Sequence, residues 1–390
     1  MPGPSSTLRD VVAVLDELYD PRTAESWDAV GTILGDPDAE VRRVLFAVDP
    51  VQAVADEAVA LGADLVVTHH PLWLSGVTAM PASDPKGRVA HTLLSHGIAL
   101  HTCHTNADVP PLGVSAAMAD AFGLVGARPL QPATSPGPDV WTVSVPRSDA
   151  EAVLAAMHGA GAGQHEGYDR AAFTWAGAGQ FRPLEGAQPA IGRIGELERV
   201  DEVALRLVAT PDVRERVRAA MLAVHPYEVV AHDVVAAQPV PTDRGMGRIG
   251  RLPEPMSLAA FAEHVRQTLP AHHGATRLAG DPDRVIETVA LCGGSGDFLL
   301  GPATAAGADV HVTSDLKHHV VSEHLERPGG CAVVDVPHWA AEWTWLPVAA
   351  AALTQRLGAT VVSQVSTLVT DPWTATLVHP DHPLEHRSPR

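Results

Sequence analysis

Apolar strand-like stretches alternate with amphipathic helical stretches in two parts of this chain, and this alternation limits the folds open to it. Residues 41–49 read as a strand that ends at Asp49, and residues 51–62 read as a helix closed by Gly62. Residues 63–68 read as a second, buried strand, and the region from about residue 284 repeats the alternation. Strands separated by helices of about ten residues indicate a parallel sheet covered by helices. We therefore predict an α/β fold.

A short internal repeat relates the two α/β parts. GADLVVTHH at 62–70 and GADVHVTSD at 307–315 share five of nine residues in the same strand context. In this alignment His69 and His70 correspond to Ser314 and Asp315. We predict that residues 1–128 and 245–390 are two related halves of one discontinuous domain.

The segment between the halves has a different pattern. Linkers rich in Pro, Ser and Gly occur at 131–139 and 236–245. Between them the predicted order is strand, helix, strand, strand, helix, strand, which is the ferredoxin-like order. The chain is therefore predicted to carry an inserted α+β ferredoxin-like domain at 129–244.

Composition excludes several classes of function. The formal net charge is −19 and no cluster of Lys or Arg interrupts the acidity, so stable nucleic-acid binding is not expected. The N-terminal residues lack the pattern of a signal peptide, and no apolar run of about 18 residues predicts a membrane span. Three distant cysteines without a C-x-x-C pair favour a reduced, cytoplasmic protein.

Side chains of the types that bind metals follow three predicted strands. His69 and His70 end one strand, Asp108 follows another, and His338 and Glu342 begin a helix after a third, four residues apart and so on one face. Because loops converge at the carboxyl ends of strands in open α/β sheets, we expect these side chains to lie together. Their nitrogen and oxygen atoms suit Zn, Fe(II), Mn or Co. Five ligands exceed the needs of one catalytic zinc, so two metals roughly 3.5 to 4 Å apart are predicted.

Each of these signals has an ordinary structural interpretation. An adjacent His pair is usually two unrelated histidines, an H-x-x-x-E pair is usually a helix surface pair, and Asp108 alone fits a helix N-cap. The coincidence of all three at strand ends favours the metal site.

Nearby residues are weaker candidates. Asp49 and His104 could accept or donate hydrogen bonds behind the ligands. Asp315 and His318 are predicted as acid or base residues, although both would also be ordinary on a helix surface. The turn CGGSGD at 292–297 could bind phosphate, but it lacks the full glycine spacing and the P-loop lysine, which favours a tight turn. No G-x-S-x-G motif supports a serine hydrolase.

Several motifs together resemble those of one family. SWDAVGTILG, VVTHHPLW, HTNAD, SDLKHH and DVPHWAAEW are similar in order and spacing to the Nif-three-like family, also called GTP cyclohydrolase I type 2 homologues. The segment with HPYEVVAHDV resembles a CutA- or PII-like insert. Two departures are that Pro337 stands where the family usually has Gly, and that the insert motif usually reads H-P-Y-E-E.

The resemblance implies two divalent metals per subunit, bound by His69, His70, Asp108, His338 and Glu342. It also implies a homohexamer with its metal sites facing an internal cavity.

Two classes of function follow. The first is a metal-dependent hydrolase, similar to a GTP cyclohydrolase, that acts on a nucleotide-like or phosphate-bearing small molecule. The second is a metal-handling or regulatory scaffold without turnover, which a binding module such as the insert would suit. A purely structural metal site is disfavoured because five ligands shared by two metals leave open coordination positions.

Overall fold

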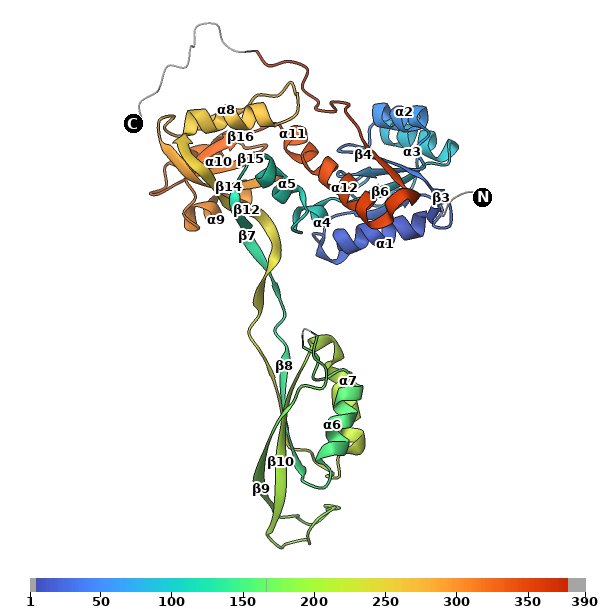
Figure 1. Ribbon diagram of the computed structural model, residues 1–390, viewed down its shortest axis with the longest axis vertical. Coiled ribbons are helices and arrows are strands. Elements are labelled where there is room, and N and C mark those ends of the chain that lie inside the picture. The colour runs from blue at the N-terminus through green and yellow to red at the C-terminus, as the bar shows by residue number, and fades with distance from the viewer. Residues whose placement is uncertain (1–4, 166, 378–390) are drawn as a thin grey trace. The chain divides into compact units, whose positions relative to one another are not determined.

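The computed structural model describes residues 5–165 and 167–377 of the chain (Figure 1). The chain forms two compact units, a discontinuous unit of Met1–Ala133 with Asp243–Arg390 and an inserted unit of Thr134–Thr242. Both boundaries fall within the two Pro-rich linkers. Each unit is described by itself.

The first sheet of the discontinuous unit has five strands in the order β17-β4-β5-β6-β2. Four strands are parallel, and β2 pairs antiparallel with β6. The strands are β2 (Gly31–Leu34), β4 (Arg43–Ala47), β5 (Leu65–Thr68), β6 (Ala99–Thr102) and β17 (Val362–Val365). The helices are α1 (Leu8–Leu18), α2 (Gln52–Leu61), α3 (Pro85–Ser95), α4 (Thr105–Asp108), α5 (Val114–Ala121) and α12 (Trp345–Leu357).

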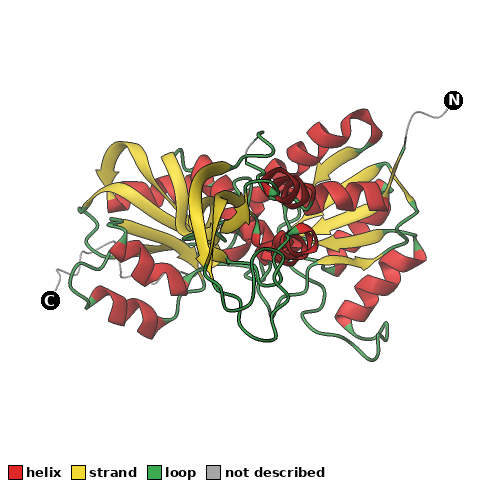
Figure 2. Cartoon of the chain, turned by 90° about the horizontal axis from the view of Figure 1, so that it is seen from below, coloured by secondary structure: helices red, strands yellow, loops and turns green. Residues whose placement is uncertain are grey.

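Helices cover both faces of this sheet (Figure 2). Val44 and Phe46 on β4 pack in one apolar cluster with α1 and α12, whereas Leu45 and Ala47 pack in another with α2 and α3. Successive side chains of a strand point to opposite faces, so a strand covered on both faces must be apolar throughout. This requirement explains why β5 reads Leu-Val-Val-Thr and is buried at every position.

Local signals set the ends of these helices. Thr7 caps α1 in a reciprocal capping box with Asp10. Gly62 ends α2 in the left-handed conformation, with φ of 60°, which a glycine adopts without steric cost. Asp84 caps α3, and Pro85 occupies its first turn. The starts of α1 and α3 and the end of α2 are therefore set by local sequence.

The second sheet has six strands in the order β13-β16-β15-β14-β12-β7. Its central strands β14, β15 and β16 are parallel. The strands are β7 (Val125–Ser135), β12 (Val240–Ser257), β13 (Arg277–Ala279), β14 (Val285–Ser295), β15 (Val310–Ser314) and β16 (Ala332–Asp335), and a short sheet pairs β1 (Ser6–Thr7) with β3 (Glu40–Val41). The helices are α8 (Leu258–Thr268), α9 (Leu300–Ala305), α10 (His318–Leu325) and α11 (His338–Trp343), and 3-10 turns are η1 (Pro21–Thr23), η3 (Asp297–Leu299) and η4 (Gly358–Thr360).

One apolar core joins the two sheets. It contains residues of α1, β4, β5, α5, α8, β14, β15 and α12, so neither half buries its apolar surface alone. Tyr19 of the first half and Trp345 of the second are fully buried and meet edge to face, with ring centroids 5.3 Å apart. The second half also contributes an edge strand to the first sheet, because β17 from near the end of the chain pairs with β4. The two α/β halves are thus one folded unit.

The inserted unit has its own sheet and core. Its elements are β8 (Asp139–Pro146), α6 (Ala150–Gly159), β9 (Phe173–Phe181), β10 (Glu198–Ala209), η2 (Pro211–Val213), α7 (Arg214–Val224) and β11 (His232–Ala236). The sheet order is β11-β8-β10-β9, and the printed pairs are all antiparallel. Trp141, Val217 and Met221 are among the residues of a separate apolar cluster that both helices cover. This unit can bury its core without the rest of the chain.

None of the described helices combines the length and the apolar character needed to cross a membrane.

Candidate metal centre

The carboxyl ends of three strands place the predicted ligands around one cavity. β5 leads into His69 and His70, β6 leads through α4 to Asp108, and β16 leads into α11 with His338 and Glu342. All five side chains line the same cavity of about 440 Å³. The structure therefore brings together residues that are up to almost 270 positions apart in the chain, as predicted.

The two neighbouring histidines reach the same point because the chain bends after Thr68. In a continuing strand His69 and His70 would point to opposite sides, but β5 ends at Thr68, whose hydroxyl donates to the carbonyl of His70. Their rings lie 5.3 Å apart, and Nε2 of each faces Glu342.

The carboxylate of Glu342 lies at the centre of the cluster. Its Oε1 is 2.8 Å from Nε2 of His338 and 3.4 Å from Nε2 of His69, while its Oε2 is 3.0 Å from Nε2 of His70. The Nε2 atoms of His70 and His338 are 3.2 Å apart. A carboxylate that faces three imidazole nitrogens with its two oxygens could share the binding of a divalent cation with them.

A further histidine joins the cluster. His104, which the sequence suggested only as a supporting residue, forms a group with His69 and His70 whose ligand atoms all lie within 4.8 Å of one another. His70, His338 and Glu342 form a second such group. His70 belongs to both groups, so the two overlap, and either could hold a metal ion.

Each imidazole of the cluster has its other nitrogen occupied. Nδ1 of His69 contacts the carbonyl oxygen of Cys103 at 3.0 Å. Carboxylates face the other three Nδ1 atoms at 2.6 to 2.7 Å, in the pairs His70–Asp49, His104–Asp28 and His338–Asp315. When Nδ1 donates to these acceptors, Nε2 carries the lone pair that a metal requires. In that tautomer each of the four rings would present its Nε2 to a cation in the cavity.

Charges are concentrated in this buried cluster. Burial acts to raise the pKa of Glu342, but the adjacent imidazoles of His70, His338 and His69 outweigh it and hold the pKa well below its usual range. Burial acts to lower the pKa of His338, but the carboxylates of Glu342 and Asp315 raise it to about 11. The positive charge of His338 thus compensates the carboxylate, and a divalent cation could take the place of its proton.

Asp108 tests whether the residues of the cavity fit a metal. Its Oδ1 is buried and makes no hydrogen bond within the described residues. Burial, reinforced by the charge of Glu342, raises the pKa of Asp108 well above its usual range. A buried carboxylate oxygen without a partner is costly, and a cation would satisfy it. The residues present therefore fit a divalent metal.

The predicted acid or base residues lie in different places. The carboxylate of Asp315 contacts Nδ1 of His338 at 2.7 Å, so Asp315 supports a candidate ligand. Its backbone has a positive φ of 59° directly after β15. His318 begins α10 and lines a separate cavity of about 350 Å³ with Arg277 and Asp335. It is not among the residues that line the metal cavity.

The CGGSGD turn approaches the ligands through its backbone. Gly294 has a φ of 70°, and a Cβ there would lie 2.5 Å from Oε1 of Glu342. The hydroxyl of Thr313 donates to the carbonyl of Gly294 and fixes the turn. A side chain at this position would displace Glu342, so the turn brings the second sheet close to the candidate metal centre.

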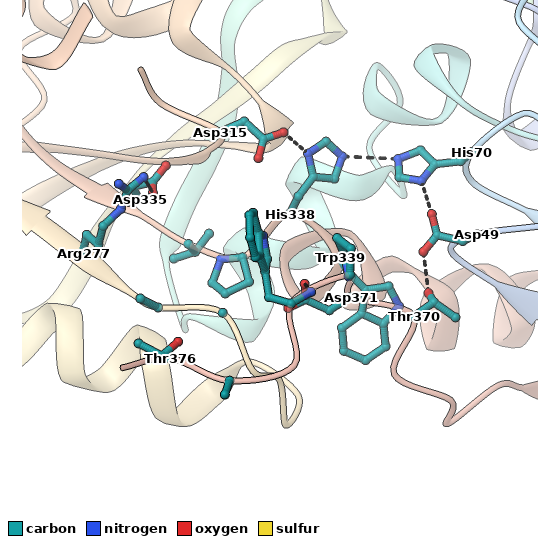
Figure 3. Close-up of a pocket in the computed structure, with 17 residues that line it drawn as sticks. Asp49, His70, Arg277, Asp315, Asp335, His338, Trp339, Thr370, Asp371 and Thr376 are labelled. Carbon is teal, nitrogen blue, oxygen red and sulfur yellow. Dashed lines mark hydrogen bonds and ion pairs between the residues drawn. The ribbon is translucent and has the colours of Figure 1, made fainter. Parts of the chain in front are cut away.

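A second cavity of about 680 Å³ lies against His70 and His338 (Figure 3). Figure 3 shows a chain of contacts that runs from Asp315 through His338 and His70 to Asp49 and on to Thr370. Thr370 follows β17, so the last part of the described chain supports a ligand of the first half.

Comparison with known proteins identifies the family. The family model described as Duf34/NIF3 (NGG1p interacting factor 3) matches residues 6–372. The chain belongs to the Duf34/NIF3 family. The resemblance inferred from the motifs is thus confirmed.

Members of the Duf34/NIF3 family with similar sequences are named as homologues of one enzyme. A "GTP cyclohydrolase 1 type 2 homolog" of Mycobacterium bovis is 45% identical over 95% of this chain and 97% of its own length. A protein of the same name from Bacillus subtilis is 36% identical over 84% of this chain and 87% of its own length.

Solved structures show the same mixed α/β fold. A Bacillus cereus protein described as related to NIF3 is 31% identical, with a TM-score of 0.73, and covers 96% of this chain and all of its own. A Staphylococcus aureus protein is 27% identical, with a TM-score of 0.80, and covers 95% of this chain and 99% of its own.

Two supporting residues of the site were not predicted from the sequence. The carboxylate of Asp28 contacts Nδ1 of His104, and the hydroxyl of Thr370 donates to the carboxylate of Asp49. Each supporting residue lies far along the chain from the residue it contacts. The only sequence signal for Asp28 was its place in the family motif SWDAVGTILG. Thr370 carried none.

Proposed function

We propose that this protein binds two divalent metals and acts as a metal-dependent hydrolase on a nucleotide-like or phosphate-bearing small molecule. The observation that carries the proposal is the position of Glu342, whose two oxygens face three imidazole nitrogens, next to the unpartnered oxygen of Asp108. The ligands proposed are His69, His70, Asp108, His338 and Glu342 together with His104, and the donor set suits Zn, Fe(II), Mn or Co.

The chemistry divides between the metals and the chain. A bound pair of divalent cations would supply Lewis acidity and a nucleophilic water at neutral pH. The chain would hold the four imidazoles in their metal-binding tautomer and orient the carboxylates of Asp108 and Glu342. Asp315 contacts His338 and lines the second cavity, so it could accept a proton at its carboxylate from a substrate that reaches into that cavity. His318 lines another cavity and is a weaker proposal. The names of the curated relatives support a nucleotide such as GTP as the first substrate to test.

Turnover by a variant of one ligand tests the hydrolase. We expect metal-reconstituted protein to hydrolyse GTP or a phosphomonoester, and His69→Ala to lose at least 100-fold in kcat, because acid–base and metal catalysis contribute on this order. His91→Ala, a change at an exposed histidine on α3, is the matched control and should retain full activity. Equal turnover by wild type and His69→Ala, with equal metal content, would contradict the proposal.

A metal-handling or regulatory scaffold is the second candidate. The observation that favours it is the inserted unit, which has its own apolar core and so can serve as a separate binding module. We propose that this unit is CutA- or PII-like, which its βαββαβ order and antiparallel sheet support. A carrier should transfer zinc to a competing apo-protein while turning over no substrate, whereas a hydrolase should retain its metal.

Assembly and location are part of the same proposal. We propose a cytoplasmic homohexamer, on the strength of the family resemblance and of the three buried, unpaired cysteines. Size-exclusion chromatography with light scattering of the full chain should give a mass near six times 40.9 kDa. A monomer at micromolar concentration would contradict it.

A further inference from the structure

Two exposed aromatic side chains stand on the wall of the metal cavity. Trp27 is 58% exposed and Phe298 is 51% exposed, and both line the cavity that the candidate ligands share. Aromatic rings beside polar groups in a cavity are typical of ligand sites. The two rings come from different halves of the unit, Trp27 from the loop before β2 and Phe298 from η3 after β14.

The residues on either side of Trp27 form hydrogen bonds with the segment that carries the candidate ligand His104. The carboxylate of Asp28 contacts Nδ1 of His104 at 2.7 Å and accepts from the backbone N–H of Thr105 at 3.0 Å. The backbone N–H of Glu25 donates to the hydroxyl of Thr105 at 2.9 Å. The Trp27 ring itself meets His104 edge to face, with centroids 6.0 Å apart. The indole is therefore held at a defined position beside a candidate ligand.

The segment that carries Phe298 lies close to a different candidate ligand, Glu342. It follows the turn at Gly294, which lies against the carboxylate of Glu342. The backbone N–H of Leu299 donates to the carbonyl of Gly296 and closes η3, which carries Phe298. A bulky residue at Gly296 is excluded, because a Cβ there would lie 2.6 Å from the hydroxyl of Thr313. The phenyl ring is thus also placed by the backbone that contacts a ligand.

The cavity differs from an ordinary anion site in the basic residues that line it. Among the described residues that line it there is no Lys or Arg. Arg248 is buried nearby, but its guanidinium donates to the carbonyls of Gly245, Gly247, Val109 and Pro110. Metals bound by the candidate ligands would therefore attract an anionic group here, and the rest of a ligand would meet aromatic and backbone surface.

We propose that Trp27 and Phe298 form an aromatic clamp that binds a planar conjugated ring, such as a nucleobase-like heterocycle, next to the metal centre. The proposal rests on the metal site of the proposed function and specifies its substrate class. It assigns the two side chains to substrate selection and gives them no part in metal binding.

Two metal-binding hydroxamates that differ only in their ring test the clamp. Benzohydroxamate carries a planar ring and cyclohexanecarbohydroxamate a saturated one, so any difference in affinity comes from the ring. Calorimetry on zinc-reconstituted, full-length protein should show the planar compound binding about tenfold more tightly or better, because stacking on an aromatic side chain contributes on this order. The preference should disappear in Trp27→Ala and in Phe298→Ala, and should return in Trp27→Phe.

A matched control separates this cavity from its neighbour. Trp373 is 68% exposed but lines the second cavity against His70 and His338, so Trp373→Ala should retain the preference. Equal affinity of wild type for the two compounds, or loss of the preference in Trp373→Ala alone, would overturn the clamp.

Zinc content, measured for each protein, distinguishes failure of the clamp from failure of the metal site. Zinc-loaded protein that binds neither compound overturns the clamp while leaving the metal site standing. Protein that takes up no zinc contradicts the proposed function itself.

Discussion

At the scale of single residues, the candidate centre depends on groups that support the ligands as much as on the ligands. Three carboxylates and one backbone carbonyl select the tautomers of four imidazoles. Gly294 provides another kind of support, because its lack of a side chain leaves room for Glu342. Of these supporting groups, the sequence predicted Asp49 alone in that role.

Replacing Gly294 should weaken metal binding. In Gly294→Ala the new Cβ would lie 2.5 Å from Oε1 of Glu342, so the carboxylate must move and zinc affinity should fall roughly 10- to 100-fold. Gly123→Ala is the control, because Gly123 has a similar φ of 72° with nothing within 4 Å of its Cβ. Both variants should lose roughly 1 to 2 kcal/mol of stability from the left-handed backbone. Zinc competition with a chromogenic chelator measures the affinities, and equal values for the two variants would refute the argument.

At the scale of elements, two strands that are buried on both faces contain histidines. The hydrogen-bond partners of these histidines come from other segments of the folded chain. His101 on β6 and His311 on β15 are both buried inside parallel strands. His101 contacts the hydroxyl of Thr32 on β2, and His311 contacts the carbonyl of Gly296. Burial lowers the pKa of each imidazole to about 4. Both strands therefore fold with neutral histidines.

This burial should make the fold sensitive to acid. The folded-state pKa of about 4 is below the unfolded value near 6.5, so the stabilising effect is complete above pH 6.5 and is lost as the pH falls toward 4. In His311→Gln the fall in melting temperature between pH 6.5 and 4.5 should be smaller than in wild type. His91→Gln, at an exposed position, should melt like wild type throughout. Thermal denaturation of EDTA-treated protein measures this, and parallel pH curves for all three proteins would contradict it.

At the scale of the whole molecule, the candidate ligands connect two halves that already share one core. His69, His70, His104 and Asp108 come from the first half, and His338 and Glu342 come from the second. The inserted unit contributes none of these ligands, which all belong to the discontinuous unit. Metal binding should therefore stabilise one unit selectively.

Removal of metal should affect one of two thermal transitions. A ligand that binds only the folded state at 100 times its Kd stabilises that state by about 2.7 kcal/mol, so EDTA should lower the melting temperature of the discontinuous unit by several degrees. The inserted unit should melt unchanged, because its core is separate. Differential scanning calorimetry of the full chain, with zinc and with EDTA, measures both transitions. An equal shift of both, or of neither, would contradict the assignment of the ligands.

The sequence by itself determined the α/β pattern, the strands that end at His69 and near Asp108, and the helix that carries His338 and Glu342. These features follow from the spacing of apolar residues and from the chemistry of residue types, and both can be seen within a short stretch of sequence. Only the tertiary structure decided that His104 joins the cluster, that Asp28 and Thr370 support it, and that β17 crosses back to the first sheet. Those relations depend on which distant segments meet once the shared core closes, and no short stretch of sequence contains that information.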